Sequence, residues 1–295
     1  MLLESNDPRL KDAGQTTIGD TPLLRLSKTG DPSRPIFVKL ENTNPGGSIR
    51  DRYIHEIVDI ALRAGQLQRG DTIVLAGIDD SAVSAASMAA QHGLKTVVFA
   101  PQSSVRRLVP LVEQGATIHW TDDALGLDGA VQEAAAFARE AADRAYVDGY
   151  RRTAVKEAYA ALAREIVTDL GEVVLGGFVT SVTTGATFRE VSRLLRATQP
   201  QLEVRGARLV QNEFATAEEN PFIRQVNMSD VWRLRDQLVE DEGLLLGPKG
   251  AACVLLCLEL QAEIPEGRAV VALNPDSGSR YVGWENQTLF RTKFR

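Results

Sequence analysis

Residues 38–48, VKLENTNPGGS, decide the fold of this chain. The stretch begins inside a short apolar run, residues 36–40, which is typical of a strand. Pro45 and the glycine pair that follows it favour a turn, and Ser48 can cap the start of a helix. Apolar side chains at helical spacing then run through residues 51–64. The stretch therefore predicts a strand, a turn and a helix in direct succession.

The same alternation of strand and helix continues along the chain. Alternating strands and helices predict mainly parallel sheets that are covered by helices on both faces. No linker rich in Pro, Gly or Ser divides the chain, so we expect two interlocked α/β domains with a cleft between them. The further predicted strands are residues 72–75, 96–100, 117–120, 178–180, 208–210 and 269–273; the further predicted helices are residues 81–92, 105–114, 127–144, 154–170, 187–198, 230–241 and 250–262.

Composition excludes some classes of protein. The 295 residues carry a formal net charge of -6, which disfavours a nucleic-acid surface, because phosphate binding needs an excess of clustered Lys and Arg. No apolar run is long enough to cross a membrane. Residues 1–7 lack the basic start and apolar core of a secretory signal. We therefore expect a cytoplasmic protein.

Cysteine and histidine give no sign of a metal site. Cys253 and Cys257 are four residues apart and share a face of a predicted helix. That spacing favours two small buried apolar side chains over a redox or metal pair. The three histidines lie in separate segments without ligand spacing, so no metal is predicted.

Four segments resemble landmarks of a known family, the cysteine synthase and cystathionine β-synthase family of fold-type-II pyridoxal phosphate (PLP) enzymes. Any one of them is a weak signal, but they occur in the family's order and the resemblance runs from about residue 18 to residue 290. They are IGDTPLLRL (residues 18–26), VKLENTNPGGS (38–48), EGLLLGP (242–248) and NPDSGSRY (274–281).

The resemblance implies the tryptophan synthase β-like fold, with two interlocked three-layer domains. It places a smaller α/β domain at residues 38–147 and a larger one at residues 1–37 plus 148–295. It also implies a homodimer, and a cleft in which several members of the family dock the tail of a protein partner.

The chain departs from the family at the residue that carries its chemistry. The family holds PLP through a lysine amine, one residue after Asn-Pro-Gly-Gly-Ser, and that position is Arg50 here. A guanidinium stays protonated at any working pH and is a poor nucleophile, so Arg50 cannot form the imine. Lys39 and Lys95 are the nearest lysines in sequence, and nothing in the sequence places either in the cleft.

Four further departures accompany Arg50. Asp79 and Asp80 replace residues that bind the substrate carboxylate and the cofactor ring, and would repel an anion. The family's motif with a serine at the pyridine nitrogen is one residue shorter here and offers Lys249, a cation that would oppose protonation of that nitrogen. A segment that includes a wall of the cleft is shortened to residues 214–225. The loop that cradles the cofactor phosphate lacks two of the family's glycines, although its hydroxyls leave weak anion binding open; its candidate residues are Thr183, Thr184, Gly185 and Thr187.

The replacements are charged and complementary. We expect Arg50 to pair with Asp80 or Asp79, and Lys249 to join this pair beside Ser81. This charged cluster would occupy part of the cleft volume that PLP fills in the family. A buried charge is tolerable there only when it is paired. The alternative is a set of solvated loop charges without a joint role.

These five departures predict a cysteine-synthase-like pseudoenzyme with a degenerate PLP site. We expect no cofactor, and a binding, regulatory or complex-forming subunit; PLP bound without a covalent bond is the alternative. The competing hypothesis is an enzyme of small amino-acid metabolism, a lyase or transferase on a serine-derived substrate. That enzyme would carry out β-replacement, or cofactor-free acid–base chemistry in the rebuilt cleft.

Overall fold

The computed structural model describes residues 17–103, 108–147, 152–183, 185–209 and 220–281. These residues form two compact units, which are considered separately. Unit 1 comprises Met1–Thr43 with Tyr159–Arg295, and unit 2 comprises Asn44–Ala158. The predicted smaller domain, residues 38–147, overlaps unit 2, and its boundaries stay a prediction.

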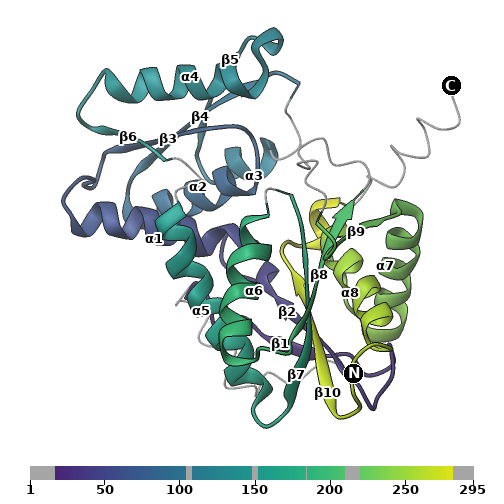
Figure 1. The fold of residues 1–295 in the computed structure, drawn as a ribbon. Coiled ribbons are helices and arrows are strands. Elements are labelled where there is room, and N and C mark those ends of the chain that lie inside the picture. Colours follow the sequence, from purple (N-terminus) through teal and green to yellow (C-terminus); the bar gives the residue numbers. More distant parts are fainter. Residues whose placement is uncertain (1–16, 104–107, 148–151, 184, 210–219, 282–295) are drawn as a thin grey trace, which may run out of the picture. The chain divides into compact units, whose positions relative to one another are not determined.

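Unit 1 is built on a sheet of six strands in the order β1-β2-β10-β7-β8-β9. Only β1 runs antiparallel to its neighbour. Figure 1 shows α5 and α6 on one side of this sheet and α7 and α8 on the other. The elements are β1 (Leu23–Arg25), β2 (Ile36–Leu40), α5 (Arg152–Leu170), β7 (Val174–Ser181), α6 (Ala186–Thr198), β8 (Glu203–Leu209), β9 (Ile223–Val226), α7 (Met228–Glu242), α8 (Pro248–Leu260) and β10 (Arg268–Asn274), with short 3₁₀ turns at Glu41–Thr43 and Gly278–Tyr281.

Unit 2 is built on a sheet of four parallel strands in the order β5-β4-β3-β6. The apolar side chains of α2 and α3 pack on one face of this sheet and those of α4 on the other. Its elements are α1 (Arg50–Arg63), β3 (Thr72–Ala76), α2 (Asp80–His92), β4 (Lys95–Pro101), α3 (Leu108–Glu113), β5 (Thr117–Thr121), a 3₁₀ turn at Asp123–Leu125, α4 (Gly126–Arg139) and β6 (Arg144–Tyr146).

The predicted α/β class with mainly parallel sheets is confirmed. Six of the seven residues of β10 are fully buried, which agrees with a central parallel strand that helices cover on both faces. The short strands β1, β6 and β9 were not predicted, and the predicted helix 127–144 ends at Arg139. Cys253 and Cys257 are buried and free in α8, as predicted. Among the described residues, no helix combines the length and apolarity that a membrane crossing requires.

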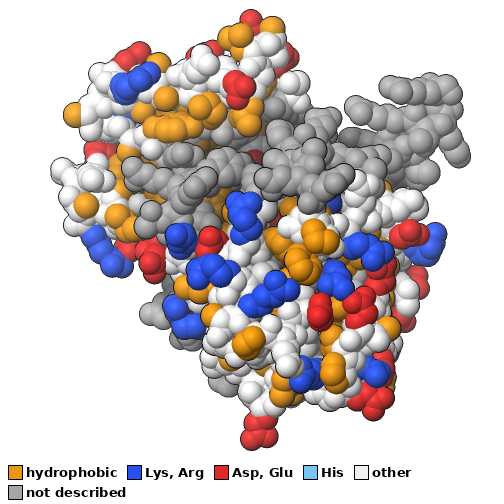
Figure 2. Space-filling model, in the orientation of Figure 1, with side chains coloured by type: hydrophobic (Ala, Val, Ile, Leu, Met, Phe, Trp, Pro, Cys, Tyr) orange, Lys and Arg blue, Asp and Glu red, His pale blue; other side chains and the backbone are white. Residues whose placement is uncertain are grey.

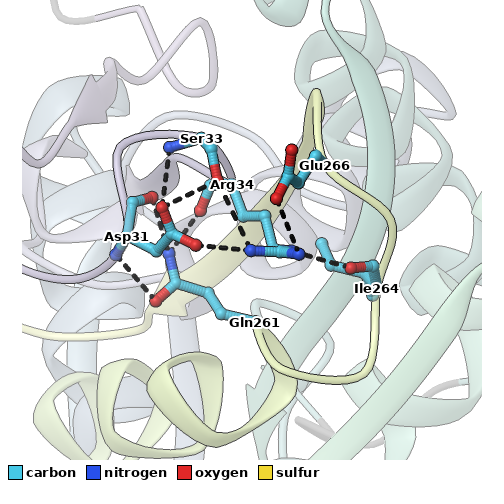
Figure 3. Close-up of polar contacts among 6 residues, drawn as sticks. All are labelled: Asp31, Ser33, Arg34, Gln261, Ile264 and Glu266. Carbon is cyan, nitrogen blue, oxygen red and sulfur yellow. Dashed lines mark hydrogen bonds and ion pairs between the residues drawn. The ribbon is translucent and has the colours of Figure 1, made fainter.

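The loop before β2 is fixed to the end of α8 by a set of polar contacts (Figure 3). The Gln261 amide oxygen accepts the backbone N–H of Asp31 (3.1 Å), and its amide nitrogen donates to the carbonyl oxygens of Asp31 and Arg34. The Arg34 guanidinium donates to the Asp31 carboxylate (2.5 Å) and to the carbonyl of Ile264 (2.9 Å). These contacts fix the chain as it enters β2, beside β10.

A second clasp joins the loop after β1 to the end of α7. The Glu242 carboxylate accepts the backbone N–H groups of Ser27, Lys28 and Thr29 and the hydroxyl of Ser27, at 2.7–3.1 Å. Burial raises the pKa of Glu242, but these hydrogen bonds outweigh burial and lower the pKa to about 2. The charged form of Glu242 is therefore the form that stabilises the fold.

We predict that Glu242→Gln lowers the free energy of unfolding by about 1 kcal/mol at neutral pH, a figure reduced for the solvent exposure of this group. Since the folded pKa lies below the ordinary value, this stability is present above pH 4.5 and is lost as the pH falls toward about 2. Urea unfolding across this pH range measures the effect. Glu240→Gln, an exposed change in the same helix, serves as the control. Equal losses for both variants at every pH would contradict the role of the clasp.

Candidate functional site: the starts of four helices

The start of α1 carries Arg50, the residue at the family's lysine position. Arg50 is the first residue of the helix and is half-buried. Its backbone N–H donates to the hydroxyl of Ser48 (3.2 Å), but the capping residue of α1 is Ile49 and not Ser48 as predicted. The guanidinium carbon lies 5.6 Å from the ring centre of Tyr53, one turn further along α1. The aromatic ring thus offers Arg50 a cation–π partner within unit 2.

The start of α2 is closed by a side chain of the chain itself. Asp79 is the capping residue, in an extended conformation, and its carboxylate accepts the backbone N–H groups of Ser81 (2.9 Å) and Ala82 (3.1 Å). The Ser81 hydroxyl is bonded in turn to the hydroxyl of Tyr53 (2.6 Å), and both of these side chains are buried. Ser81 therefore joins α2 to α1, and Asp79 caps α2 beside it.

Electrostatics connect Arg50 to this cap. Burial raises the pKa of Asp79, the Arg50 guanidinium acts in the opposite direction, and the neighbouring Asp80 adds to the increase. Arg50 therefore supports the charged form of Asp79. This electrostatic effect agrees with the predicted pairing of Arg50 with an aspartate of this loop. That the two side chains form a buried ion pair stays a prediction.

The cap has a chemical consequence. The first N–H groups of a helix have no partner inside the helix and form a favourable site for an anion. In α2 the carboxylate of Asp79 already occupies two of them. A substrate carboxylate would have to displace it and would meet its negative charge.

The start of α8 carries Lys249 in unit 1. Its amine lies 3.6 Å from a carboxylate oxygen of Asp276, a buried side chain that also accepts the hydroxyl of Tyr281 (2.6 Å). Lys249 thus has an anionic neighbour in its own unit. The prediction that Lys249 joins Arg50 and the aspartates of unit 2 stays a prediction.

The start of α6 follows the loop that was predicted to bind an anion. Gly185 caps this helix with a φ of 78°, a conformation that favours glycine, and no side chain caps the helix there. A methyl group added to Gly185 would lie 2.8 Å from a guanidinium nitrogen of Arg189, so this cation lies directly against the loop. The Thr187 hydroxyl donates to that of Tyr159 (2.9 Å). Thr183 precedes the helix, and Thr184 lies outside the described residues.

A second arginine, Arg208, belongs to β8 in the same unit. Its Nε and Nη2 atoms are shielded from solvent, and neither has a hydrogen-bond partner among the described residues. Buried donors of this kind are uncommon, because a lost hydrogen bond to a charged group costs about 1.5–3 kcal/mol.

Neither of the neighbouring lysines can replace Arg50. Lys39 is completely buried, and its amine is held by the carboxylates of Glu165 (3.0 Å) and Asp169 (2.9 Å) and by the carbonyl of Thr21 (2.6 Å). Lys95 is exposed and opens β4 at its amino end, whereas ligands of parallel sheets bind at the carboxyl ends of the strands. Neither side chain is therefore placed for a covalent bond to a cofactor.

Sequence analysis did not identify three residues that lie at or near these helix starts or strand ends: Tyr53, Asp276 and Arg208. Tyr53 lies one turn after Arg50, so helical spacing was an available signal. Arg208 lies near the carboxyl end of a parallel strand, where a polar residue is a signal of ligand binding. Asp276 belongs to a landmark segment, but its contact with Lys249 joins residues far apart in the sequence and had no local signal.

Comparison with known proteins gives the family. A family model described as "Pyridoxal-phosphate dependent enzyme" matches residues 15–221, more than half of the chain. The chain is 28% identical to an O-acetylserine dependent cystathionine beta-synthase of Bacillus subtilis, over 90% of this chain and 94% of that protein. It is 27% identical to an O-ureido-L-serine synthase of Streptomyces lavendulae, over 90% of this chain and 89% of that protein.

The fold agrees with this relationship. A crystal structure of O-ureido-L-serine synthase superposes with a TM-score of 0.80 at 26% identity, covering 90% of this chain and 92% of that one. The predicted resemblance to cysteine synthase-like, fold-type-II PLP enzymes is therefore confirmed.

The expectation of no cofactor is wrong, because the matching family is one of PLP-dependent enzymes. The described residues fit one end of PLP better than the other. The uncapped start of α6, with Arg189 against it, fits a phosphate, whereas position 50 offers no amine for the aldehyde. The change at position 50 is a local departure in a chain that matches its relatives over most of its length. The chain belongs to the family of pyridoxal-phosphate dependent enzymes.

Proposed function

We propose that this chain is a cysteine-synthase-like pseudoenzyme of the PLP-dependent family, which does not itself carry out the lysine-dependent β-replacement. It acts instead as a binding or regulatory subunit, as a homodimer that forms complexes through the former substrate site. One observation carries the proposal: the Asp79 carboxylate takes the N–H groups at the start of α2 that would otherwise hold a substrate carboxylate.

Chemistry at position 50 supports the same proposal from a second direction. β-Replacement needs an amine that forms an imine with the cofactor and later accepts a proton. Arg50 remains a guanidinium cation throughout, and its charge supports the capping carboxylate of Asp79. The two substitutions therefore stabilise each other, and each removes one requirement of the reaction.

The second candidate is an active enzyme of small amino-acid metabolism. It is favoured by the extent of the match, since the chain aligns over 90% of its length with enzymes named for synthesis from serine derivatives. Such an enzyme would need an amine in place of residue 50, and Lys39 and Lys95 do not supply one.

Turnover separates the two candidates. We predict that the purified chain, supplied with PLP, O-acetylserine and sulfide, forms cysteine no faster than a mixture of PLP and substrates without protein. The physical reason is the missing amine at position 50. Steady cysteine formation that is proportional to the protein concentration would establish the enzyme instead.

Substrate binding tests the closed helix start directly. We predict that O-acetylserine does not raise the melting temperature of the wild-type chain but does raise that of Asp79→Gly, in which the N–H groups of α2 are free. Without ligand, Asp79→Gly should melt slightly lower, since Gly caps a few tenths of a kcal/mol less well than Asp.

Asp122→Gly provides a matched control, because Asp122 caps a short 3₁₀ turn in the same unit. It should gain no response to O-acetylserine. An equal rise in melting temperature for the wild-type chain and Asp79→Gly would contradict the role given to Asp79.

A further inference from the structure

The strand β5 forms one edge of the four-stranded sheet of unit 2. The strand order is β5-β4-β3-β6, so among the described residues β5 pairs with β4 alone. The N–H and C=O groups on the outer side of an edge strand have no neighbouring strand to bond. Such a row of groups can pair with a strand of another chain, unless the edge is protected.

The other three sheet edges of the described chain are protected in the usual way. Folded proteins keep edge strands short and place charged side chains on them. The edge strands β1, β6 and β9 have three or four residues each, and each contains an arginine: Arg25, Arg144 and Arg224. The strand β5 has the sequence TIHWT, with five residues and no Lys, Arg, Asp, Glu or Pro, and its register with β4 is regular. It is therefore the edge that lacks these protections.

Exposed apolar side chains gather in the segment around β5. The described residues include fourteen large apolar side chains that are exposed, and six of these belong to residues 109–131. Figure 2 shows hydrophobic side chains exposed over α4, the helix that follows β5. Single exposed apolar side chains need no explanation, but a gathering of them is typical of a protein–protein interaction site. The six residues are Val109, Val112, Trp120, Leu125, Leu127 and Val131.

The two faces of the sheet differ beside β5. Ile118 packs on the core cluster of α2 and α3, whereas the ring of His119 lies 5.6 Å from the ring of Phe137 in α4. Because side chains alternate along a strand, Trp120 lies on the α3 face with Ile118. Leu125 ends the short turn that leads from β5 into α4. An added strand would therefore meet Trp120 on one face and the start of α4 on the other.

The charges beside this edge are negative. Between β5 and a second β5 strand, the same acidic side chains would be brought together, so their repulsion disfavours a second copy of this chain as the partner. A segment that carries Lys or Arg would be attracted instead. From residue 113 to residue 137 the sequence contains neither Lys nor Arg but five exposed acidic residues, which are Glu113, Asp122, Asp123, Asp128 and Glu133.

We propose that β5 binds an extended segment of a partner protein, in which apolar residues alternate with Lys or Arg, as a fifth strand of the sheet of unit 2. The backbone of the segment bonds to the outer side of β5. Its apolar side chains contact Trp120 on one face, and its basic side chains meet Asp128 and Glu133 of α4 on the other. The inference goes beyond the proposed function, which assigns complex formation to the former substrate site, and it holds whether or not the chain is catalytic.

The test uses a synthetic peptide with blocked ends and the sequence Lys-Val-Lys-Val-Lys-Val-Lys, titrated calorimetrically into the full-length chain. We expect saturable binding to the wild type and at least tenfold weaker binding to Trp120→Lys, which gives β5 the kind of charge that the other edges carry. Val239→Lys is the matched control, because Val239 and Trp120 are both 42% exposed but Val239 belongs to α7 in unit 1. This control should bind the peptide as the wild type does.

Two modified peptides separate strand addition from charge attraction. The first is N-methylated at its three central residues, so it keeps its side chains and charge but lacks the N–H groups that pair with a strand edge. The second has Glu in place of Lys. Each should bind the wild type at least tenfold more weakly than the parent peptide, and equal binding by either one overturns the proposal.

The variants also distinguish a partner segment from a second copy of the chain. Failure of the wild type to bind the peptide, or binding by Trp120→Lys within twofold of the wild type, overturns the proposal. So does a dimer of the wild type that dissociates in Trp120→Lys on sedimentation, since the edge would then belong to a second copy. If Trp120→Lys melts well below the wild type, Leu125→Lys replaces it, because Leu125 is 58% exposed, and this variant should also bind the peptide at least tenfold more weakly.

Discussion

The permanent charge of Arg50 is the constraint on which the rest of this protein depends. A lysine at this position can lose its proton and react, whereas a guanidinium remains a cation and must be stabilised as one. The chain meets this demand within unit 2, where Arg50 lies near the ring of Tyr53 and acts electrostatically on the carboxylate of Asp79. Asp79 then serves a second purpose as the cap of α2. Residue 50 is thus linked electrostatically to the cap of α2.

The helix starts of this fold have taken different roles. The start of α2 is satisfied by a carboxylate from the chain itself, and at the start of α8 Lys249 lies near the buried Asp276. The start of α6 has no capping side chain, and Arg189 lies against it. The start of α6 thus leaves room for an anion, whereas the start of α2 is occupied by a carboxylate of the chain. The expectation of no cofactor rested on five departures from the family's motifs, and it is wrong because the family that matches most of the chain is one of PLP-dependent enzymes.

Sequence reasoning succeeded where the signal is local. The periodicity of apolar residues predicted the main helices and strands, and the landmark segments predicted the family. It missed β1, β6 and β9, which have only three or four residues each and depend on pairing with distant strands. In the site, the replaced residues Arg50, Asp79 and Lys249 were visible by comparison with the family's motifs. The capping geometry of Asp79 and the contact of Lys249 with Asp276 depend on backbone conformation and tertiary packing, which local patterns do not contain.

The central claim, that residue 50 forms no covalent bond with the cofactor, can be measured on the purified wild-type chain. The chain is incubated with PLP, any imine is reduced with borohydride, and the peptides are mapped by mass spectrometry. We predict no pyridoxyl group on any specific lysine of the wild type, and a pyridoxyl group on residue 50 in Arg50→Lys. A stoichiometric pyridoxyl group on one lysine of the wild-type chain would contradict the account.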